Sequence, residues 1–200
     1  MNRLFECLDS GFFKVPDGTL INPFLNPKDI TSGLPWDVLD GLGISAGYIE
    51  PGIVSEIHVH PFISQVTVLL SGALDIHMKD SGNEDGLYTL QLRLPAPTEK
   101  PGFTTAATLT PPGTFFQIDN LRGSEPAAVL YLTSPGYILE PGDTDDALPV
   151  YDDAVVLGDE WSYLERHRNP PELRDPARSY EARQKAIERL AEKTRVSGAV

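Results

Sequence analysis

The sequence has one cysteine, few basic residues and no long apolar run. Cys7 alone permits neither a disulfide framework nor a thiolate metal cluster, and it lies in a polar segment without a motif. The sequence contains only 16 Lys and Arg but 29 Asp and Glu, which gives a formal net charge of −13. Nucleic acids and anionic membranes are bound by clustered positive charge, so neither is an expected partner.

Two further absences concern the cellular compartment. No apolar stretch approaches the roughly 20 residues that a membrane-spanning helix needs. The first residues contain no basic segment followed by an apolar run, so no secretory signal peptide is predicted. We therefore expect a soluble, cytoplasmic protein whose acidic surface serves solubility.

The chain is rich in glycine (17) and proline (18), and these residues separate short β-rich runs. In Leu87–Leu94, residues 88, 90, 92 and 94 alternate onto one face, as in a strand. No helical periodicity lies between the runs, which predicts an all-β sandwich or jelly-roll barrel. The eight predicted strands are 42–49, 54–60, 64–70, 73–79, 87–94, 104–110, 114–119 and 127–133.

The segments on either side of these runs have a different composition. Residues 1–41 are rich in turn signals and are predicted to form an irregular N-terminal arm, ahead of a barrel over 42–137. Residues 140–160 hold eight carboxylates and no Lys or Arg, which indicates an extended, solvated segment within 138–200. A C-terminal helix is predicted over about 175–195, since Asp175 is a suitable N-cap and Pro176 suits the first helical position.

The chemically most informative pattern is His58-Val-His60. Residues i and i+2 of a strand point to one face, so both imidazoles would enter the barrel about 6–7 Å apart at the backbone. Gln65 follows a turn at Pro61 and would approach from the neighbouring strand. Two imidazoles and an amide oxygen at one point are suitable ligands for a transition metal.

The spacing around this pattern resembles the first motif of the cupin superfamily: a glycine, five residues, His-x-His, four residues, a carboxylate, six residues and a glycine. Gly52, His58, His60 and Gly72 match it. The second motif, Pro-x-Gly, two residues, His, three residues, Asn, is matched by Pro111-Pro-Gly113 and by Asn120. The resemblance covers roughly residues 42–137. It implies a double-stranded β-helix, that is, a jelly-roll barrel, and dimers are common among cupins of this size.

Cupins typically hold one divalent metal through the two histidines and the carboxylate of motif one and the histidine of motif two. Here Gln65 occupies the carboxylate position and Phe116 the position of the last histidine. The resemblance therefore implies a degenerate site for Fe, Zn, Ni or Cu, or a site without metal. His77, on the next predicted strand, is a weaker candidate for an additional ligand.

Glu56 is the predicted general base, because it has the same parity as His58 on one predicted strand. A carboxylate inside a barrel has a raised pKa, as a base working near neutrality requires. Glu56 in water at the barrel mouth is the alternative. Four other side chains are predicted to line the cavity: Tyr48, Thr67, Leu69 and Phe116.

Three functions follow from this resemblance. The first is a metal-dependent enzyme acting on a small organic molecule, most simply an oxidoreductase of the dioxygenase kind. The second is a non-redox lyase or isomerase that uses Glu56 as base. The third is a metal-free module that binds or senses a small molecule, which Phe116 and the uncharged Gln65 favour.

Overall fold

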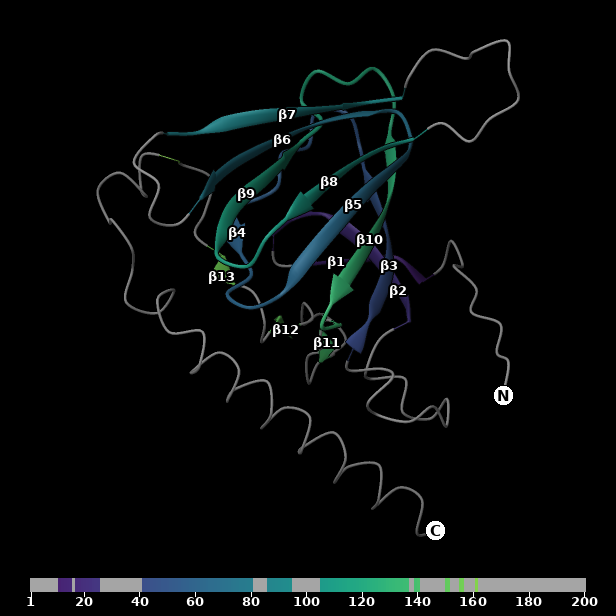
Figure 1. Cartoon of the computed structure of the whole chain (residues 1–200). Coiled ribbons are helices and arrows are strands. Elements are labelled where there is room, and N and C mark those ends of the chain that lie inside the picture. Colours follow the sequence, from purple (N-terminus) through teal and green to yellow (C-terminus); the bar gives the residue numbers. More distant parts are fainter. Residues whose placement is uncertain are drawn as a thin grey trace, which may run out of the picture.

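The structure is a computed structural model, and it describes residues 11–15, 17–25, 41–80, 86–94, 105–136, 139–140, 150–151, 155–156 and 161 (Figure 1). Regular structure in these residues consists of β-strands. The strands are β1 (Phe13–Lys14), β2 (Leu20–Leu25), β3 (Gly43–Ile49), β4 (His58–Val59), β5 (Ser64–Ser71), β6 (Ala73–Asp80), β7 (Tyr88–Arg93), β8 (Ala106–Thr110), β9 (Thr114–Asp119), β10 (Ala127–Ser134), β11 (Leu139–Glu140), β12 (Val150–Tyr151) and β13 (Val155–Val156).

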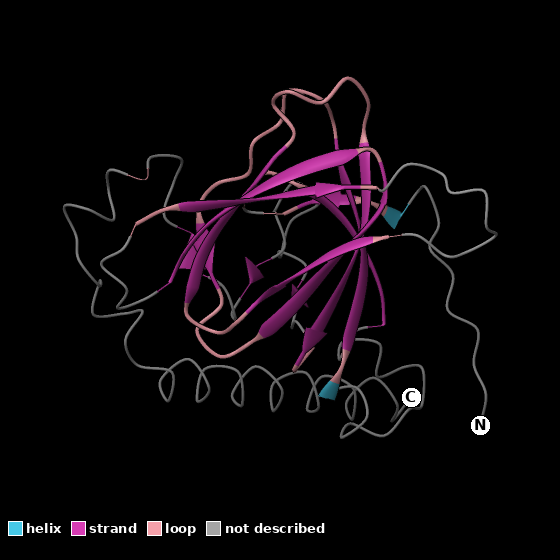
Figure 2. Ribbon diagram, turned by 45° about the horizontal axis from the view of Figure 1, so that its top comes forward, coloured by secondary structure: helices cyan, strands magenta, loops and turns pink. Residues whose placement is uncertain are grey.

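The strands form two facing antiparallel sheets and one small pair, β11–β12 (Figure 2). The first sheet has the order β1-β2-β3-β10-β5-β8, and the second has the order β13-β4-β9-β6-β7. From β3 to β10 the chain crosses repeatedly between the sheets, so strands distant in sequence become neighbours. Eight strands wound in this way form a jelly roll, the architecture predicted from the sequence.

All eight predicted β-runs contain a strand, but one of them is much shorter than expected. In the run 54–60, only β4 is a continuous strand, and Val54 makes an isolated bridge to Asp119. The backbone between them has other partners: the Ser55 amide donates to the Ile118 carbonyl and the Glu56 amide to the Asp17 carbonyl. The backbone of residues 54–57 therefore does not form a regular ladder with β9.

The N-terminal arm is less irregular than predicted. Its residues 20–25 form β2, which pairs with β3 and extends the first sheet (Ile21 opposite Gly47). The turn that leads into β2 brings Asp17 to the barrel, as the hydrogen bond between the Glu56 amide and the Asp17 carbonyl shows (2.7 Å). The predicted C-terminal helix lies outside the described residues.

The space between the sheets has an apolar and a polar part. Leu69, Val129, Ile76 and Met78 belong to the main core cluster, all at most 1% exposed. Such a core is the main source of folding free energy in a barrel of this size. Nearer the Gln65 end of β5, the inner face of the first sheet carries polar side chains. These are Ser45, Gln65, Thr67, Thr108, Thr110, Tyr131 and Thr133, all buried.

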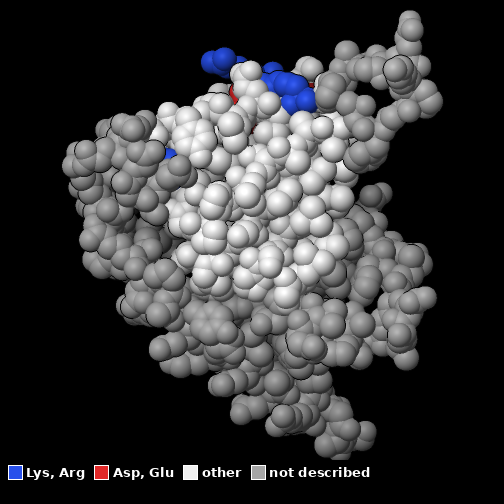
Figure 3. Space-filling model, in the orientation of Figure 1, with Lys and Arg blue, Asp and Glu red and all other residues white. Residues whose placement is uncertain are grey.

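The outer face of β5, β8 and β10 in the first sheet carries no charged residue. Outward positions of β5 and β8 include Leu70 and Leu109, which are 46% and 57% exposed. Where β5, β8 and β10 of Figure 1 lie, Figure 3 shows a broad described surface without Lys, Arg, Asp or Glu. Among the described residues, no helix has the length and apolar character needed to span a membrane.

Candidate functional site in the barrel

His58 and His60 both lie inside the barrel, as predicted. Their side chains meet edge to face with ring centroids 5.5 Å apart, and the two residues are 5% and 2% exposed. Nδ1 of His58 lies 2.9 Å from the Glu56 carbonyl oxygen. Because a carbonyl oxygen only accepts, Nδ1 carries a proton, and Nε2 is left to face the cavity.

Asp17 is the partner of His58, and the sequence did not predict it. The Asp17 Oδ2 atom lies 3.5 Å from His58 Nε2, and both side chains are more than nine-tenths buried. Oδ1 accepts hydrogen bonds from the backbone amide and the hydroxyl of Thr19, at 2.9 and 2.8 Å. These two bonds orient the carboxylate and leave Oδ2 toward the imidazole. The signal in the sequence is the Asp-Gly-Thr turn at 17–19, which is typical of a local side-chain cap.

The two facing atoms of the Asp17–His58 pair are placed to share a proton or a cation. A neutral His58 with its proton on Nδ1 presents a lone pair at Nε2, directed toward a carboxylate oxygen that also carries lone pairs. At 3.5 Å the two atoms are too far apart for a good direct hydrogen bond but close enough to repel. A second proton on His58, or a cation between the atoms, removes this repulsion.

This pair borders a small cavity with a free volume of about 20 Å³. Gln65, predicted as a third ligand, lines the cavity, and its Nε2 donates to the Thr67 hydroxyl (3.2 Å). Neither Lys nor Arg is among the described residues of the wall. The lining residues are Asp17, Thr19, Ile21, Ser45, His58, His60, Gln65, Ile118 and Tyr131.

The four predicted lining residues have different positions. Phe116 is 1% exposed and packs against His58, with ring centroids 4.0 Å apart, so it fills the space that its position in the motif gives to a histidine. Thr67 and Leu69 face the barrel interior, as their parity predicts, but they are not in the cavity wall. Tyr48 is on the outer face of β3, where it contacts Phe12, because Ser45 and Ile49 set the inward parity. Its predicted position is therefore wrong, and Ser45 takes that place.

Tyr131 brings a buried hydroxyl to the cavity wall. Its ring passes so close to β3 that a Cβ at Gly47 would overlap it. The hydroxyl has no hydrogen-bond partner. Burial, and secondarily the negative charge of Asp17, raises the pKa of this hydroxyl well above its ordinary value. Tyr131 therefore stays neutral and can donate to a ligand.

The raised pKa of Tyr131 predicts a loss of stability in alkali. Above about pH 10 the unfolded chain loses the tyrosine proton while the folded chain keeps it, so the free energy of unfolding falls as pH rises. This group contributes a loss of about 1.4 kcal/mol between pH 8 and pH 11. Denaturant unfolding at both pH values should show a smaller loss for Tyr131→Phe than for the wild type. Equal losses of unfolding free energy in the two proteins would contradict this role of Tyr131.

Glu56 is not in the cavity. Its side chain is exposed, and Asp17 rather than Glu56 supplies the carboxylate beside His58. The predicted row of Glu56, His58 and His60 fails because the chain forms a regular strand only from His58. The backbone carbonyl of Glu56 still contributes, since it accepts the proton of His58 Nδ1.

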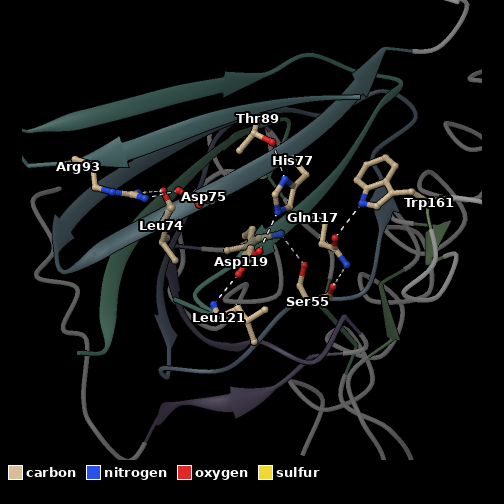
Figure 4. A network of polar contacts seen from close by, with 11 residues as sticks. Ser55, Leu74, Asp75, His77, Thr89, Arg93, Gln117, Asp119, Leu121 and Trp161 are labelled. Atoms are coloured by element: carbon tan, nitrogen blue, oxygen red, sulfur yellow. Dashed lines mark hydrogen bonds and ion pairs between the residues drawn. The ribbon is translucent and has the colours of Figure 1, made fainter. Parts of the chain in front are cut away.

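His77 points away from the cavity, on the outer face of β6 (Figure 4). Its Nδ1 lies 2.8 Å from the Thr89 hydroxyl and its Nε2 lies 2.9 Å from Asp119 Oδ2. On the same face, Arg93 pairs with Asp75 at 2.5 Å. The inward parity of β6 belongs to Leu74, Ile76 and Met78, so His77 does not reach the other two histidines.

Within the described part of the chain, no group of three His, Cys, Asp or Glu side chains is arranged to hold a metal ion. The donors at the cavity are two imidazoles, one carboxylate and the Gln65 amide. His58 Nε2 and Asp17 Oδ2, 3.5 Å apart, have the spacing of two ligands on one ion, because ligands about 2.1 Å from a tetrahedral centre lie about 3.4 Å apart. The residues therefore do not form a complete metal site.

No protein-family model and no curated protein matches the chain. Among solved structures, it is similar to peruvianin-I, a cysteine peptidase from Thevetia peruviana latex (20% identity, 60% of this chain and 58% of that one, TM-score 0.41). It is also similar to the capsular polysaccharide assembling protein CapF from Staphylococcus aureus (18% identity, 78% of this chain and 32% of that one, TM-score 0.48). A third similar structure is that of an uncharacterized protein from Klebsiella pneumoniae with a double-stranded β-helix domain (15% identity, 68% of this chain and 92% of that one, TM-score 0.43).

The chain thus spans just over half of peruvianin-I and about a third of CapF. All three TM-scores are below 0.5, so the strand order itself carries the fold assignment. In that order, the first sheet holds β3-β10-β5-β8 and the second holds β4-β9-β6-β7. With both glycine-framed motifs on these strands, the chain has the double-stranded β-helix fold of the cupins.

Proposed function

We propose that the protein is an enzyme that moves protons on a small organic molecule bound in the barrel cavity, as an isomerase or lyase does. The observation that supports it is the buried Asp17–His58 pair. Its two facing atoms, Oδ2 and Nε2, border the cavity 3.5 Å apart. The Thr19 and Glu56 hydrogen bonds hold both side chains in place, as acid–base catalysis requires.

The two groups have complementary roles toward a carbonyl compound. With His58 doubly protonated, Nε2–H donates its proton to the carbonyl oxygen while Asp17 Oδ2 removes a proton from the adjacent carbon. The C–H bond breaks, its electron pair forms a carbon–carbon double bond, and an O–H bond forms. Return of the proton to the same carbon gives exchange. In an α-hydroxy carbonyl compound, delivery of the proton to the other carbon, while the adjacent hydroxyl gives its proton back to His58 Nε2, gives isomerisation. Tyr131, neutral at the cavity wall, is placed to donate a hydrogen bond to a bound molecule.

This proposal is tested by proton exchange with solvent. The purified protein is incubated in D₂O with a panel of small hydroxy-aldehydes and hydroxy-ketones, and deuterium at carbons next to the carbonyl is followed by NMR. We expect incorporation above the buffer background with wild type and none above it with His58→Ala. Background rates for every compound, with a folded protein, would overturn the acid–base proposal.

A metal-dependent oxidoreductase of the dioxygenase kind is the second candidate. The observation that favours it is the same 3.5 Å separation, which also suits two ligands of one ion. His58, Asp17, and His60 after a side-chain shift would hold Fe, Zn, Ni or Cu, and the ion would supply Lewis-acid or oxygen chemistry.

Metal analysis separates the two candidates. Under the acid–base proposal, protein purified without added ions contains far less than one transition metal per chain, and a chelator leaves deuterium exchange unchanged. A metal near one per chain that His58→Ala and Asp17→Asn both remove would establish the second candidate instead. A metal-free protein that binds small molecules without exchange would be a binding or sensing module.

A further inference from the structure

We infer that the barrel cavity binds one water molecule, held by Tyr131, Asp17 and His58, which bridges the two facing atoms of the Asp17–His58 pair. The inference goes beyond the proposed acid–base function, because the water is bound whether or not the pair is catalytic. It begins from the Tyr131 hydroxyl, which is buried in the cavity wall and has no hydrogen-bond partner within the described part of the chain.

The size and the polarity of the cavity fit one water molecule. Its free volume is about 20 Å³, and about 10–15 Å³ of such space is enough to hold a water. A buried water also needs two to four polar partners, because it gives up the hydrogen bonds that it makes in bulk solvent. Polar groups of Tyr131, Asp17 and His58 lie in the wall, so both conditions are met.

The hydrogen-bonding capacity of these three groups matches that of one water. Nδ1 of His58 carries a proton that points to the Glu56 carbonyl oxygen, so Nε2 of the neutral ring is an acceptor. Oδ1 of Asp17 is bonded to Thr19, which leaves Oδ2 as a second acceptor. The Tyr131 hydroxyl is a donor, since burial raises its pKa and keeps it neutral. A water donates one hydrogen to each acceptor and accepts the hydrogen of Tyr131.

The 3.5 Å separation of Asp17 Oδ2 and His58 Nε2 suits a bridging water. A water oxygen about 2.8 Å from both atoms sees them about 80° apart, and its own O–H bonds diverge only somewhat more, so each hydrogen bond is bent slightly. The lone pairs that repel each other across the gap then both face a hydrogen atom. The water therefore removes the repulsion without a second proton on His58 and without a metal ion.

The position of this water also selects the atom that a ligand brings to the pair. A ligand reaches the facing atoms by displacing the water, so the atom that replaces it has to accept the hydrogen bond of Tyr131. A carbonyl or hydroxyl oxygen does so, whereas an apolar group leaves the Tyr131 hydroxyl buried without a partner, which is costly.

A high-resolution crystal structure of the full-length protein, purified without added ions, tests the inference directly. Anomalous diffraction distinguishes a water from a transition metal. We expect one peak of electron density within about 3.2 Å of Tyr131 Oη, Asp17 Oδ2 and His58 Nε2, without anomalous signal. A cavity without density, or a peak with the anomalous signal of a transition metal, would overturn the inference.

Magnetic relaxation dispersion of ¹⁷O water counts long-lived internal waters in solution. Ser45 lines the cavity, and Ser45→Val adds about one methyl group where one water fits, so the count should fall by about one. Ser64→Val makes the same change at an outward position of β5 and is the matched control, with the count unchanged. Equal counts in wild type and Ser45→Val would contradict a water at this site.

Tyr131→Phe provides a readout that does not depend on filling the cavity. Because the hydroxyl is bonded to the water, its removal should lower the melting temperature by about 2–4 °C. Thr133→Val is the control. It also removes a buried hydroxyl that has no partner among the described residues, but this hydroxyl is outside the cavity wall, so the melting temperature should stay constant or rise. A Tyr131→Phe variant that melts as high as the wild type would overturn the inference.

These measurements separate the water from the acid–base function. Water at the site without deuterium exchange into any substrate would leave the inference standing and refute only the acid–base function. Deuterium exchange by a protein whose cavity holds no water would refute the inference and leave the acid–base function standing.

Discussion

Asp17→Asn is expected to lower the rate of substrate deuterium exchange by about 10²- to 10⁴-fold, the usual contribution of a positioned acid or base. Asn keeps the shape of Asp and an oxygen that can accept the Thr19 hydrogen bonds, so the turn at 17–19 should persist. What is lost is the carboxylate at Oδ2, which the mechanism uses to remove the carbon-bound proton. Exchange is followed by NMR, and thermal melting reports whether the barrel stays folded.

Glu56→Gln is the matched control. It also converts one carboxylate to an amide, and Glu56 is the base that the sequence alone predicts. Because its side chain is exposed and outside the cavity wall, we expect exchange to continue at the wild-type rate. If Glu56→Gln lowered the exchange rate strongly and Asp17→Asn did not, the base would be Glu56, as strand parity predicts, and not Asp17.

The barrel and its two histidines were predictable because they depend on short-range patterns. Glycine-framed spacing fixes where the hairpins turn, and period-two alternation then decides which side chains enter the core. His58 and His60 follow from the first motif, and Phe116 follows from the second. The register places His58 opposite Phe116, which brings the two motifs together on β4 and β9.

The carboxylate partner was not predictable in the same way. Asp17 precedes His58 by about forty residues and lies in the arm, outside both motifs. Nothing local indicates that β2 will join β3 and so bring the turn at 17–19 to the barrel. Such a contact is decided by packing of the whole molecule rather than by propensity.

Strand parity predicted the wrong position for the Glu56 side chain and left open which face of the sheet carries His77. Parity holds only while the chain stays a regular strand, and the Ser55 and Glu56 amides bond outside a regular ladder, to Ile118 and Asp17. At His77 the alternation itself was correct, since Asp75 and His77 share a face. Which face is inward was decided by the apolar residues Leu74, Ile76 and Met78.

Phe116→His should convert the cavity into a metal site. Phe116 packs against both imidazoles, with ring centroids 4.0 Å from His58 and 5.4 Å from His60. A third imidazole at this position would join two others within reach of one ion, the donor set that Zn²⁺ and Ni²⁺ prefer. Without metal the variant should be destabilised by about 2–4 kcal/mol, because apolar contacts are lost and a polar ring is buried.

Added metal should restore the free energy of unfolding that Phe116→His loses, and it should leave the stability of the wild type nearly unchanged. A ligand at one hundred times its Kd adds about 2.7 kcal/mol to the free energy of unfolding, provided that it binds only the folded state. Thermal melting with and without Zn²⁺ or Ni²⁺ measures the recovery, and calorimetry gives the stoichiometry, expected near one ion per chain.

Phe115→His is the control that distinguishes a metal site created at position 116 from a general effect of one added histidine. Phe115 is the neighbouring residue on β9, is also buried, and packs on the other side of the sheet with Ile57, Val59 and Trp161. Its replacement should cost similar stability but place the imidazole away from His58 and His60, so metal should not restore it. Equal recovery of both variants, or none in either, would contradict the conclusion that Phe116 is what keeps the two-histidine site from holding an ion.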